Sequence, residues 1–218
     1  MYFESREQAG QKLAAELFER YRYDNCAVVA LNEGAVIVGE QIAAVLHSVL
    51  TMLLVENIDI PGEGLSFGGV SQNGAFTYNA EFSEGEKQAF TSEFHGYLEE
   101  QKRQAFQRIN RLLGDGGLID NDMLRDHTVI LVSDGFESAA VIDSALDFLK
   151  PIRINRLVVA APVASIAAVD RLHTAADELH ILDVKQNYIK TDHYYNSNDV
   201  PSREETIEKI NKIILNWR

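Results

Sequence analysis

The sequence predicts an α/β protein whose sheet is mainly parallel, has about five strands and is covered by helices on both faces. Apolar segments of strand length alternate along the chain with amphipathic segments of helix length. The apolar segments, such as CAVVAL (26–31) and HTVILV (127–132), are hydrophobic throughout instead of at every second position. Strands that are buried on both faces have this pattern, which is typical of parallel sheets.

The predicted helices and strands follow one another in a regular order. Ser5 and Gln8 have the spacing of a capping box, and Leu13 and Leu17 repeat on one face, so 5–20 is the first predicted helix. The other predicted helices are 35–48, 83–113, 141–149, 165–175 and 202–217, and the other predicted strands are 51–56, 156–163 and 178–183.

A β-hairpin interrupts this alternation. LSFGGV (65–70) and AFTYNA (75–80) flank an Asn73-Gly74 pair, which is a strong hairpin signal. We therefore expect one domain, 1–218, with a hairpin hood at 65–80 and a C-terminal helix at 202–217. An exposed apolar hairpin such as LSFGGV often marks a dimer contact, so a homodimer is the oligomer to test for.

Composition restricts the partners. The net charge is −13, which argues against nucleic acid and anionic membrane surfaces, because both require a basic face. No run of about 18 apolar residues occurs, and the first residues do not resemble a signal peptide. A single cysteine, Cys26, excludes an internal disulfide and sits in an apolar strand. These features together favour the cytoplasm.

Three predicted loops follow strands at the edge of the sheet where ligands collect: Asn32–Ala35, Glu56–Gly64 and Ser133–Ala139. Each is also an ordinary strand–helix turn. The third carries the most chemistry, because a helix N-terminus offers unpaired N–H groups to an anion. Gly135 allows close approach of the backbone, Ser138 can cap the helix, and Asp134 can accept hydrogen bonds from sugar hydroxyls.

Other chemical signals are weak. The six histidines show no metal-ligand spacing, so no metal-binding residue is predicted. The basic stretch at 102–111 is interpreted as a solvated helix face balanced by Glu99 and Glu100, although Arg108 or Arg111 could reach an anion. The aromatic run His193–Tyr195 is interpreted as packing of the C-terminal helix.

The order of segments resembles the phosphoribosyltransferase family, which has the type I fold. In that family a hydrophobic strand ends in two acids and is followed by Gly-hydrophobic-Ala-Thr-Gly-x-Thr. Here Val129–Val132 match the strand, and the loop residues in corresponding order are Ser133, Asp134, Gly135, Phe136, Glu137, Ser138 and Ala139. The segments AGQKLAAEL, ALNEGAVIVGEQIAAVL and RLVVAAPVAS also match one bacterial branch in order and spacing.

The resemblance implies a ligand and roles for these residues. Family members bind phosphoribosyl pyrophosphate with Mg²⁺ and transfer ribosyl phosphate to a nitrogenous base. It gives Asp134 the catalytic position beside the ribose hydroxyls, and it places the 5′-phosphate on the loop 133–139. Pyrophosphate would lie on the turn that contains Glu33 and Gly34. The bacterial branch has a basic residue in this turn, where this sequence has the acidic Glu33.

Three positions depart from the family pattern in the same direction. Glu33 and Glu137 place carboxylates where phosphates would bind, and Glu56 and Asn57 stand where the branch has a lysine. A carboxylate about 5 Å from a phosphate dianion costs roughly 2 kcal/mol in water and about 7 kcal/mol at an effective dielectric constant of 20. One hypothesis is therefore a binding, regulatory or oligomerisation module with weak or no transferase activity. The other is an active transferase, or a binder of a phosphorylated sugar or nucleotide, that uses Mg²⁺.

Overall fold

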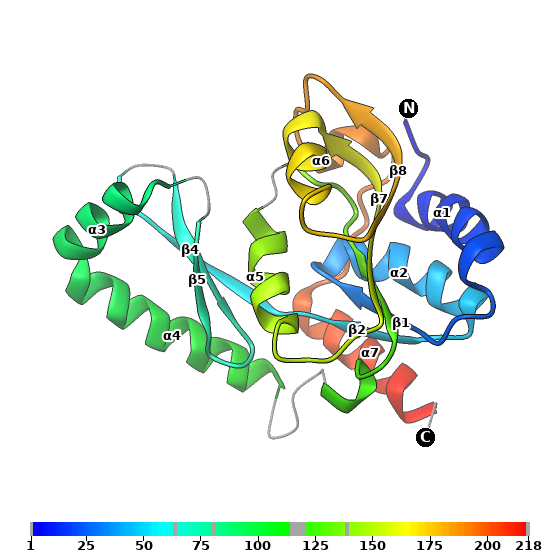
Figure 1. The fold of residues 1–218 in the computed structure, drawn as a ribbon, viewed down its shortest axis with the longest axis horizontal. Coiled ribbons are helices and arrows are strands. Elements are labelled where there is room, and N and C mark those ends of the chain that lie inside the picture. Colours follow the sequence, from blue (N-terminus) through cyan, green and yellow to red (C-terminus); the bar gives the residue numbers. More distant parts are fainter. Residues whose placement is uncertain (1, 63–64, 80–81, 114–120, 138–139, 217–218) are drawn as a thin grey trace. The chain divides into compact units, whose positions relative to one another are not determined.

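The computed structural model describes residues 2–62, 65–79, 82–113, 121–137 and 140–216 (Figure 1). The chain divides into two compact units. The first unit comprises Met1–Leu53, Leu118–Ala139 and Ile152–Arg218, and the second comprises Leu54–Gly117 and Ala140–Pro151.

The first unit is built on a five-stranded parallel sheet, as the sequence predicts. Its strands are β1 (Cys26–Ala30), β2 (Val49–Met52), β6 (Thr128–Val132), β7 (Arg156–Ser165) and β8 (Glu178–Lys185), and their spatial order is β2-β1-β6-β7-β8. Every neighbouring pair is parallel. This confirms the predicted fold class.

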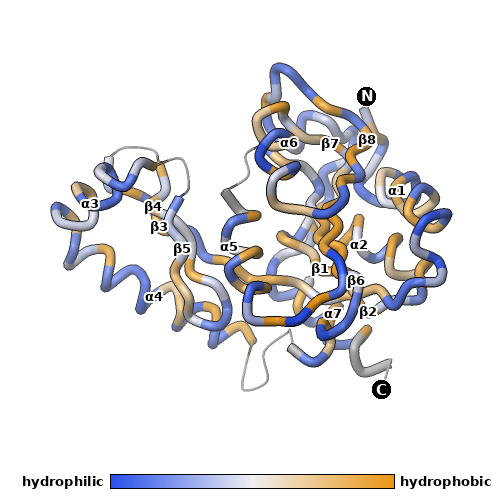
Figure 2. The backbone as a smooth tube through the Cα atoms, viewed as in Figure 1, coloured by the Kyte–Doolittle hydropathy of each residue, from blue (hydrophilic) through white to orange (hydrophobic). Residues whose placement is uncertain are grey.

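The central strands form the core of this unit. All residues of β1 and β6 are buried, and in β7 only Arg156 is exposed. Figure 2 shows these strands as hydrophobic along their length. Strands of this kind bury both faces, which explains why the sequence shows continuous apolar runs in place of alternation.

Helices cover both faces of the parallel sheet. They are α1 (Arg6–Tyr21), α2 (Glu33–Leu46), α6 (Ile166–Leu172) and α7 (Arg203–Asn216). Helix α2 connects β1 to β2, whereas α6 connects β7 to β8 in the opposite direction along the sheet. Because parallel crossovers are right-handed, the two helices lie on opposite faces, as Figure 1 shows.

The strand order reverses between β1 and β6. From β1 the chain proceeds outward to β2, and from β6 it proceeds the other way to β7 and β8. In open parallel sheets the turns at such a reversal diverge to opposite faces and leave a crevice at the carboxyl ends of the strands. The loops after β1 and β6 are therefore the places to look for a site.

The second unit contains a three-stranded antiparallel sheet and three helices. The strands are β3 (Val55–Asp59), β4 (Ser66–Ser71) and β5 (Phe76–Tyr78), and the helices are α3 (Glu84–Glu93), α4 (His95–Leu113) and α5 (Ala140–Leu149). Strands β4 and β5 form the predicted hairpin, with Gly69 opposite Thr77. The predicted capping box is present, because Ser83 and Glu86 bond reciprocally at the start of α3.

Three expectations about this region were wrong. The predicted strand 51–56 is divided, because its first residues end β2 and its last residues begin β3 in the other sheet. Glu56 and Asn57 thus lie within β3 and not on a strand–helix turn of the parallel sheet. The single predicted helix 83–113 is two helices, because Phe94 leaves the helical conformation at φ −109°, ψ 22°.

The hairpin run LSFGGV is not the exposed surface that the dimer expectation assumed. Phe67 and Val70 are each 1% exposed, whereas Leu65 is 44% exposed. The Phe67 ring packs edge-on against Phe90 and Phe94, so the run forms the core of the second unit. The homodimer remains a prediction, but an exposed hairpin no longer supports it.

The basic stretch of α4 is balanced by neighbouring acids, as expected. Lys102 pairs with Glu99 at 2.8 Å, and Arg108 pairs with Glu56 at 3.4 Å. Among the described residues, no helix has the length and apolar character needed to cross a bilayer.

Candidate functional site

The turns after β1 and β6 meet at the strand-order reversal. The backbone N–H of Leu31 donates to the Val132 carbonyl at 2.9 Å, which joins the two strand ends. Asn32 then caps α2, because its Oδ1 accepts from the Ala35 N–H at 2.6 Å. The other end of the same amide reaches across, and Asn32 Nδ2 donates to Asp134 Oδ1 at 2.9 Å.

The second oxygen of Asp134 is held by an arginine from the first helix. Arg6 Nε donates to Asp134 Oδ2 at 2.7 Å. Arg6 is 4% exposed and Asp134 is 5% exposed, so this is a buried ion pair. Removal from water is costly for both charges, and such a pair is tolerated only when its remaining hydrogen-bonding groups are satisfied.

The segment after β8 accepts a hydrogen bond from each terminal nitrogen of the Arg6 guanidinium. Arg6 Nη2 donates to Asp192 Oδ1 at 2.6 Å, and Nη1 donates to Asn198 Oδ1 at 3.0 Å. The guanidinium carbon also lies 4.5 Å from the centroid of the Tyr195 ring, within the range of a cation–π contact. Tyr195 Oη donates to the backbone carbonyl of Asp134 at 2.5 Å. We call Arg6, Asn32, Asp134, Asp192, Tyr195 and Asn198 the closed network.

Two members of this network, Arg6 and Tyr195, have pKa values above their usual range. Burial raises the pKa of Tyr195 above its usual value, and the Asp134 charge raises it further. Burial alone would lower the pKa of Arg6, but the adjacent Asp134 carboxylate outweighs burial and the pKa is raised. A charged guanidinium and a neutral phenol therefore persist throughout the physiological pH range.

Two glycines allow the parts of the network to come this close. A Cβ added at Gly34 would overlap Asp134 Oδ2 and lie 2.7 Å from Arg6 Nε. A Cβ at Gly135 would overlap the Tyr188 hydroxyl and lie 2.8 Å from the Thr191 methyl group. In the resemblance a ligand phosphate lies against Gly135. Here the side chains of Tyr188 and Thr191 occupy that space.

The remaining residues of the predicted loop take structural positions. Ser133 Oγ donates to the Gly135 carbonyl and accepts from the Gly135 N–H, at 2.8 and 3.2 Å. Phe136 is 2% exposed and rejoins the sheet through a parallel bridge to Ala164. Glu137 is exposed, and its backbone carbonyl accepts from Ser165 Oγ. The chain thus touches the sheet again at Phe136, before helix α5 begins at Ala140.

The predicted helix start of the phosphate loop falls at Ser138 and Ala139, which lie outside the described residues. The helix that follows, α5, belongs to the second unit. The described part of the loop contains Asp134 of the closed network, Gly135 beside it, and the exposed Glu137.

The carboxylate expected at the pyrophosphate turn has a partner. Glu33 is the first residue of α2, and its Oε1 accepts from Arg203 Nε of α7 at 2.5 Å. The side chains of Glu33 and Arg203 are 21% and 31% exposed. Arg6 and Arg203, which come from the two ends of the sequence, therefore bring a cation to each of these turns.

Sequence reasoning missed most of the closed network. Arg6 carries the one recognisable signal. The buried residues of α1 are Arg6, Ala9, Gly10, Leu13, Ala14, Leu17 and Tyr21. This apolar stripe therefore begins with an arginine, and a charge at a stripe position indicates a buried partner. No sequence pattern indicated Asp192 or Asn198. Tyr195 was expected to pack the C-terminal helix, whereas its ring lies 5.8 Å from that of Phe3 and its hydroxyl reaches Asp134.

Comparison with known proteins gives fold relatives. No protein-family model matches the chain. Among solved structures, TT1426 from Thermus thermophilus is 26% identical, with a TM-score of 0.73 over 100% of this chain and 99% of that one. The AQ2163 protein from Aquifex aeolicus is 10% identical, with a TM-score of 0.51 over 85% of this chain and 77% of that one. A hypoxanthine phosphoribosyltransferase from Staphylococcus aureus is 11% identical, with a TM-score of 0.47 over 85% and 76%.

Proposed function

We propose that this protein is a phosphoribosyltransferase-like protein that does not transfer ribosyl phosphate and acts instead as a binding or regulatory module. The state of Asp134 carries the proposal. The resemblance assigns this carboxylate to the ribose hydroxyls of phosphoribosyl pyrophosphate. Here one of its oxygens accepts from Arg6 and the other from Asn32, and the residue is 5% exposed. A sugar would have to displace a buried ion pair.

The electrostatics support the same conclusion. Departure of pyrophosphate requires cations aimed at the developing charge. Arg6 is paired with two carboxylates, Asp134 and Asp192, and Arg203 is paired with Glu33. The network therefore carries one cation against two carboxylates. A phosphate dianion that entered would meet a net negative group.

The donor set also does not suit Mg²⁺. This ion requires carboxylate, phosphate or water oxygens in a near-octahedral arrangement. Both Asp134 oxygens accept hydrogen bonds, and Arg6 Nε lies 2.7 Å from one of them. A metal cation placed beside Asp134 would be repelled by the guanidinium, so this carboxylate is a poor magnesium ligand.

Calorimetric titration of the full chain with phosphoribosyl pyrophosphate and Mg²⁺ tests the proposal, together with an assay of pyrophosphate release in the presence of purine and pyrimidine bases. We expect no binding tighter than millimolar and no release. The variant Tyr188→Ala opens the approach to Gly135 without removing an Asp134 partner, and the neighbouring Ile189→Ala, 60% exposed, is its control. Micromolar binding by the unmodified protein with release of pyrophosphate would overturn the proposal.

An active transferase is the second candidate, and one observation favours it. Arg6 and Arg203 place cations beside the two turns that bind phosphates in the resemblance. The Asp192 side chain is 53% exposed, so the outer partner of Arg6 sits at the surface. If ligand moves the segment that carries Asp192, Arg6 becomes available to an anion. The same titration distinguishes the two functions, because only this candidate gives release of pyrophosphate.

A further inference from the structure

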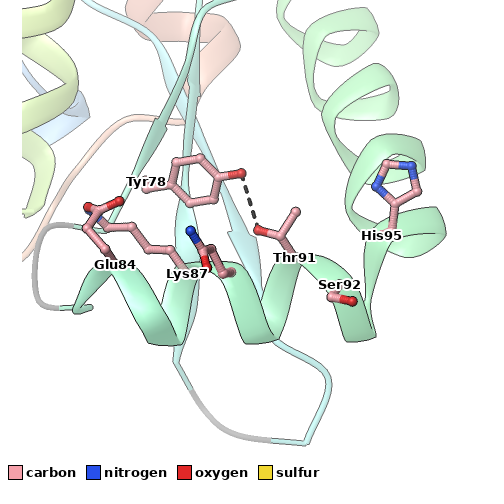
Figure 3. Close-up of a pocket in the computed structure, with 7 residues that line it drawn as sticks. Tyr78, Glu84, Lys87, Thr91, Ser92 and His95 are labelled. Atoms are coloured by element: carbon pink, nitrogen blue, oxygen red, sulfur yellow. Dashed lines mark hydrogen bonds and ion pairs between the residues drawn. The ribbon is translucent and has the colours of Figure 1, made fainter.

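The second unit contains a hollow that the proposed function does not use. Its volume is about 750 Å³, in the range of small-molecule sites. One wall is helix α3 with the first residue of α4, and Tyr78 of β5 lies opposite (Figure 3). All of its lining residues belong to the second unit.

The helical wall has an unusual composition. Its lining residues are Glu84, Lys87, Gln88, Thr91, Ser92 and His95. Spacings of three and four place the five members that belong to α3 on one helix face, and His95 follows the break at Phe94. A surface helix usually presents apolar residues to its own core at this spacing. Every member here is polar. The attachment of α3 uses other positions, because Phe90 packs edge-on against Phe67.

At the charged end of this wall, a ligand can replace the present partner of Lys87. Lys87 Nζ lies 2.7 Å from Glu84 Oε1, and the Glu84 side chain is 84% exposed. An exposed pair of this kind contributes little to stability, and an ammonium group has three donors. Lys87 is the one cation among the lining residues. An oxyanion can therefore take the place of Glu84 with little loss of stability.

Neutral hydrogen-bonding groups continue along the wall. Thr91 Oγ1 and Tyr78 Oη lie 3.3 Å apart, so the phenol and the hydroxyl meet across the middle of the hollow (Figure 3). Ser92 and His95 lie at the far end. Glu93, the last residue of α3, lies six positions beyond Lys87, about 9 Å along the helix, and His95 follows after the break at Phe94. One compact ion cannot contact both ends.

We propose that this hollow binds an elongated organic oxyanion, a carboxylate or a phosphate monoester. Its charged end contacts Lys87, its body lies between Tyr78 and Thr91, and its polar far end reaches Ser92 and His95. The site is formed by the second unit and does not depend on the closed network.

The test uses two probes with the full chain, 4-hydroxyphenyl phosphate and 4-hydroxyphenylacetate, to separate the two oxyanions. Binding is measured by calorimetry and by NMR shifts of the Gln88 side-chain amide. Lys87→Met should weaken binding about tenfold, and Glu84→Gln should tighten it several-fold, because the competing carboxylate is removed. His95→Ala should weaken binding about threefold.

Arg103→Met is the control. Arg103 also pairs with a glutamate three residues earlier, Glu100, but it does not line the hollow. The affinity of this variant should stay within twofold of that of the unmodified protein. Three results would overturn the proposal: equal effects of Lys87→Met and Arg103→Met, a reversed order of Lys87→Met and Glu84→Gln, or no binding of either probe at millimolar concentration.

Discussion

Arg6 Nε lies 2.7 Å from Asp134 Oδ2, although 128 positions separate the two residues in the sequence. This contact joins the first turn of the first helix to the end of a central strand. It also supports the proposed function, because it occupies the carboxylate that the resemblance assigns to the ribose hydroxyls. Since both charges are buried, changes to the pair and to its neighbours should be measurable as changes in stability.

Removal of Arg6 should destabilise the first unit strongly. Arg6→Met leaves the Asp134 carboxylate buried with a single amide donor, and breaking a buried pair in this way costs about 3–5 kcal/mol. Urea unfolding measures the loss. In a double-mutant cycle, Asp134→Asn added to Arg6→Met should recover part of it. A loss below about 1 kcal/mol for Arg6→Met would show that the pair is not buried in solution.

Gly34→Ala should disturb the closed network. The added Cβ overlaps Asp134 Oδ2, so the carboxylate or Arg6 must move, at a cost of about 1–3 kcal/mol. Gly85 provides the control, because it is also the second residue of its helix and a Cβ there has nothing within 4 Å. Gly85→Ala should be neutral or stabilising by up to about 1 kcal/mol. Equal effects at both positions would contradict the overlap.

Stability should fall in alkaline solution. Burial raises the pKa of Tyr188 from 10.0 to about 12. The unfolded chain therefore releases this proton near pH 10, while the folded chain keeps it until about pH 12. Its contribution to stability is complete below pH 10 and is lost between those values, by at most about 1.4 kcal/mol per pH unit.

Tyr188→Phe should make the alkaline loss of stability shallower. Urea unfolding at pH 9, 10 and 11 (values chosen to bracket the unfolded-state pKa of about 10) measures the slope. Tyr23→Phe is the control, since Tyr23 is 88% exposed. If the two variants have the same slope, Tyr188 is not buried against Gly135.

The Tyr195 hydroxyl can be tested apart from its ring. Tyr195→Phe keeps the aromatic face below Arg6 but removes the donor to the Asp134 carbonyl. A lost hydrogen bond that leaves a buried carbonyl unpaired costs about 1–3 kcal/mol. Tyr195→Leu removes both interactions and should cost more. Thermal unfolding, monitored by circular dichroism, compares the two variants. Equal losses of stability would show that the Tyr195 ring contributes nothing beyond its hydroxyl.

The sequence predicted the parallel sheet well because burial on both faces leaves a local mark. CAVVAL and HTVILV are apolar at every strand position, and the corresponding strands are fully buried. Caps were also predictable, since Ser5 and Ser83 bond to groups three residues away. Prediction failed at 51–56, where an apolar run passes from one sheet into another. Periodicity detects burial but does not say which sheet buries a residue.

The candidate site was predictable only in part. Asp134 and Gly135 were found because they follow a buried strand, where the turns of parallel sheets place their polar groups. Their partners Arg6, Asp192 and Asn198 come from the two ends of the chain. Such contacts have no fixed spacing in sequence, so neither periodicity nor motif identifies them. For the same reason the sequence did not identify Arg203 as the partner of Glu33.

The sequence by itself determined the α/β class, the order of the strands along the chain and the acidic turns beside Gly34 and Gly135, because each depends on residues close together in the chain. The tertiary structure alone decided that Asp134 is already bound by Arg6 and Asn32. The physical reason is that the strand-order reversal brings distant segments to one point, and the charges that meet there set the chemistry.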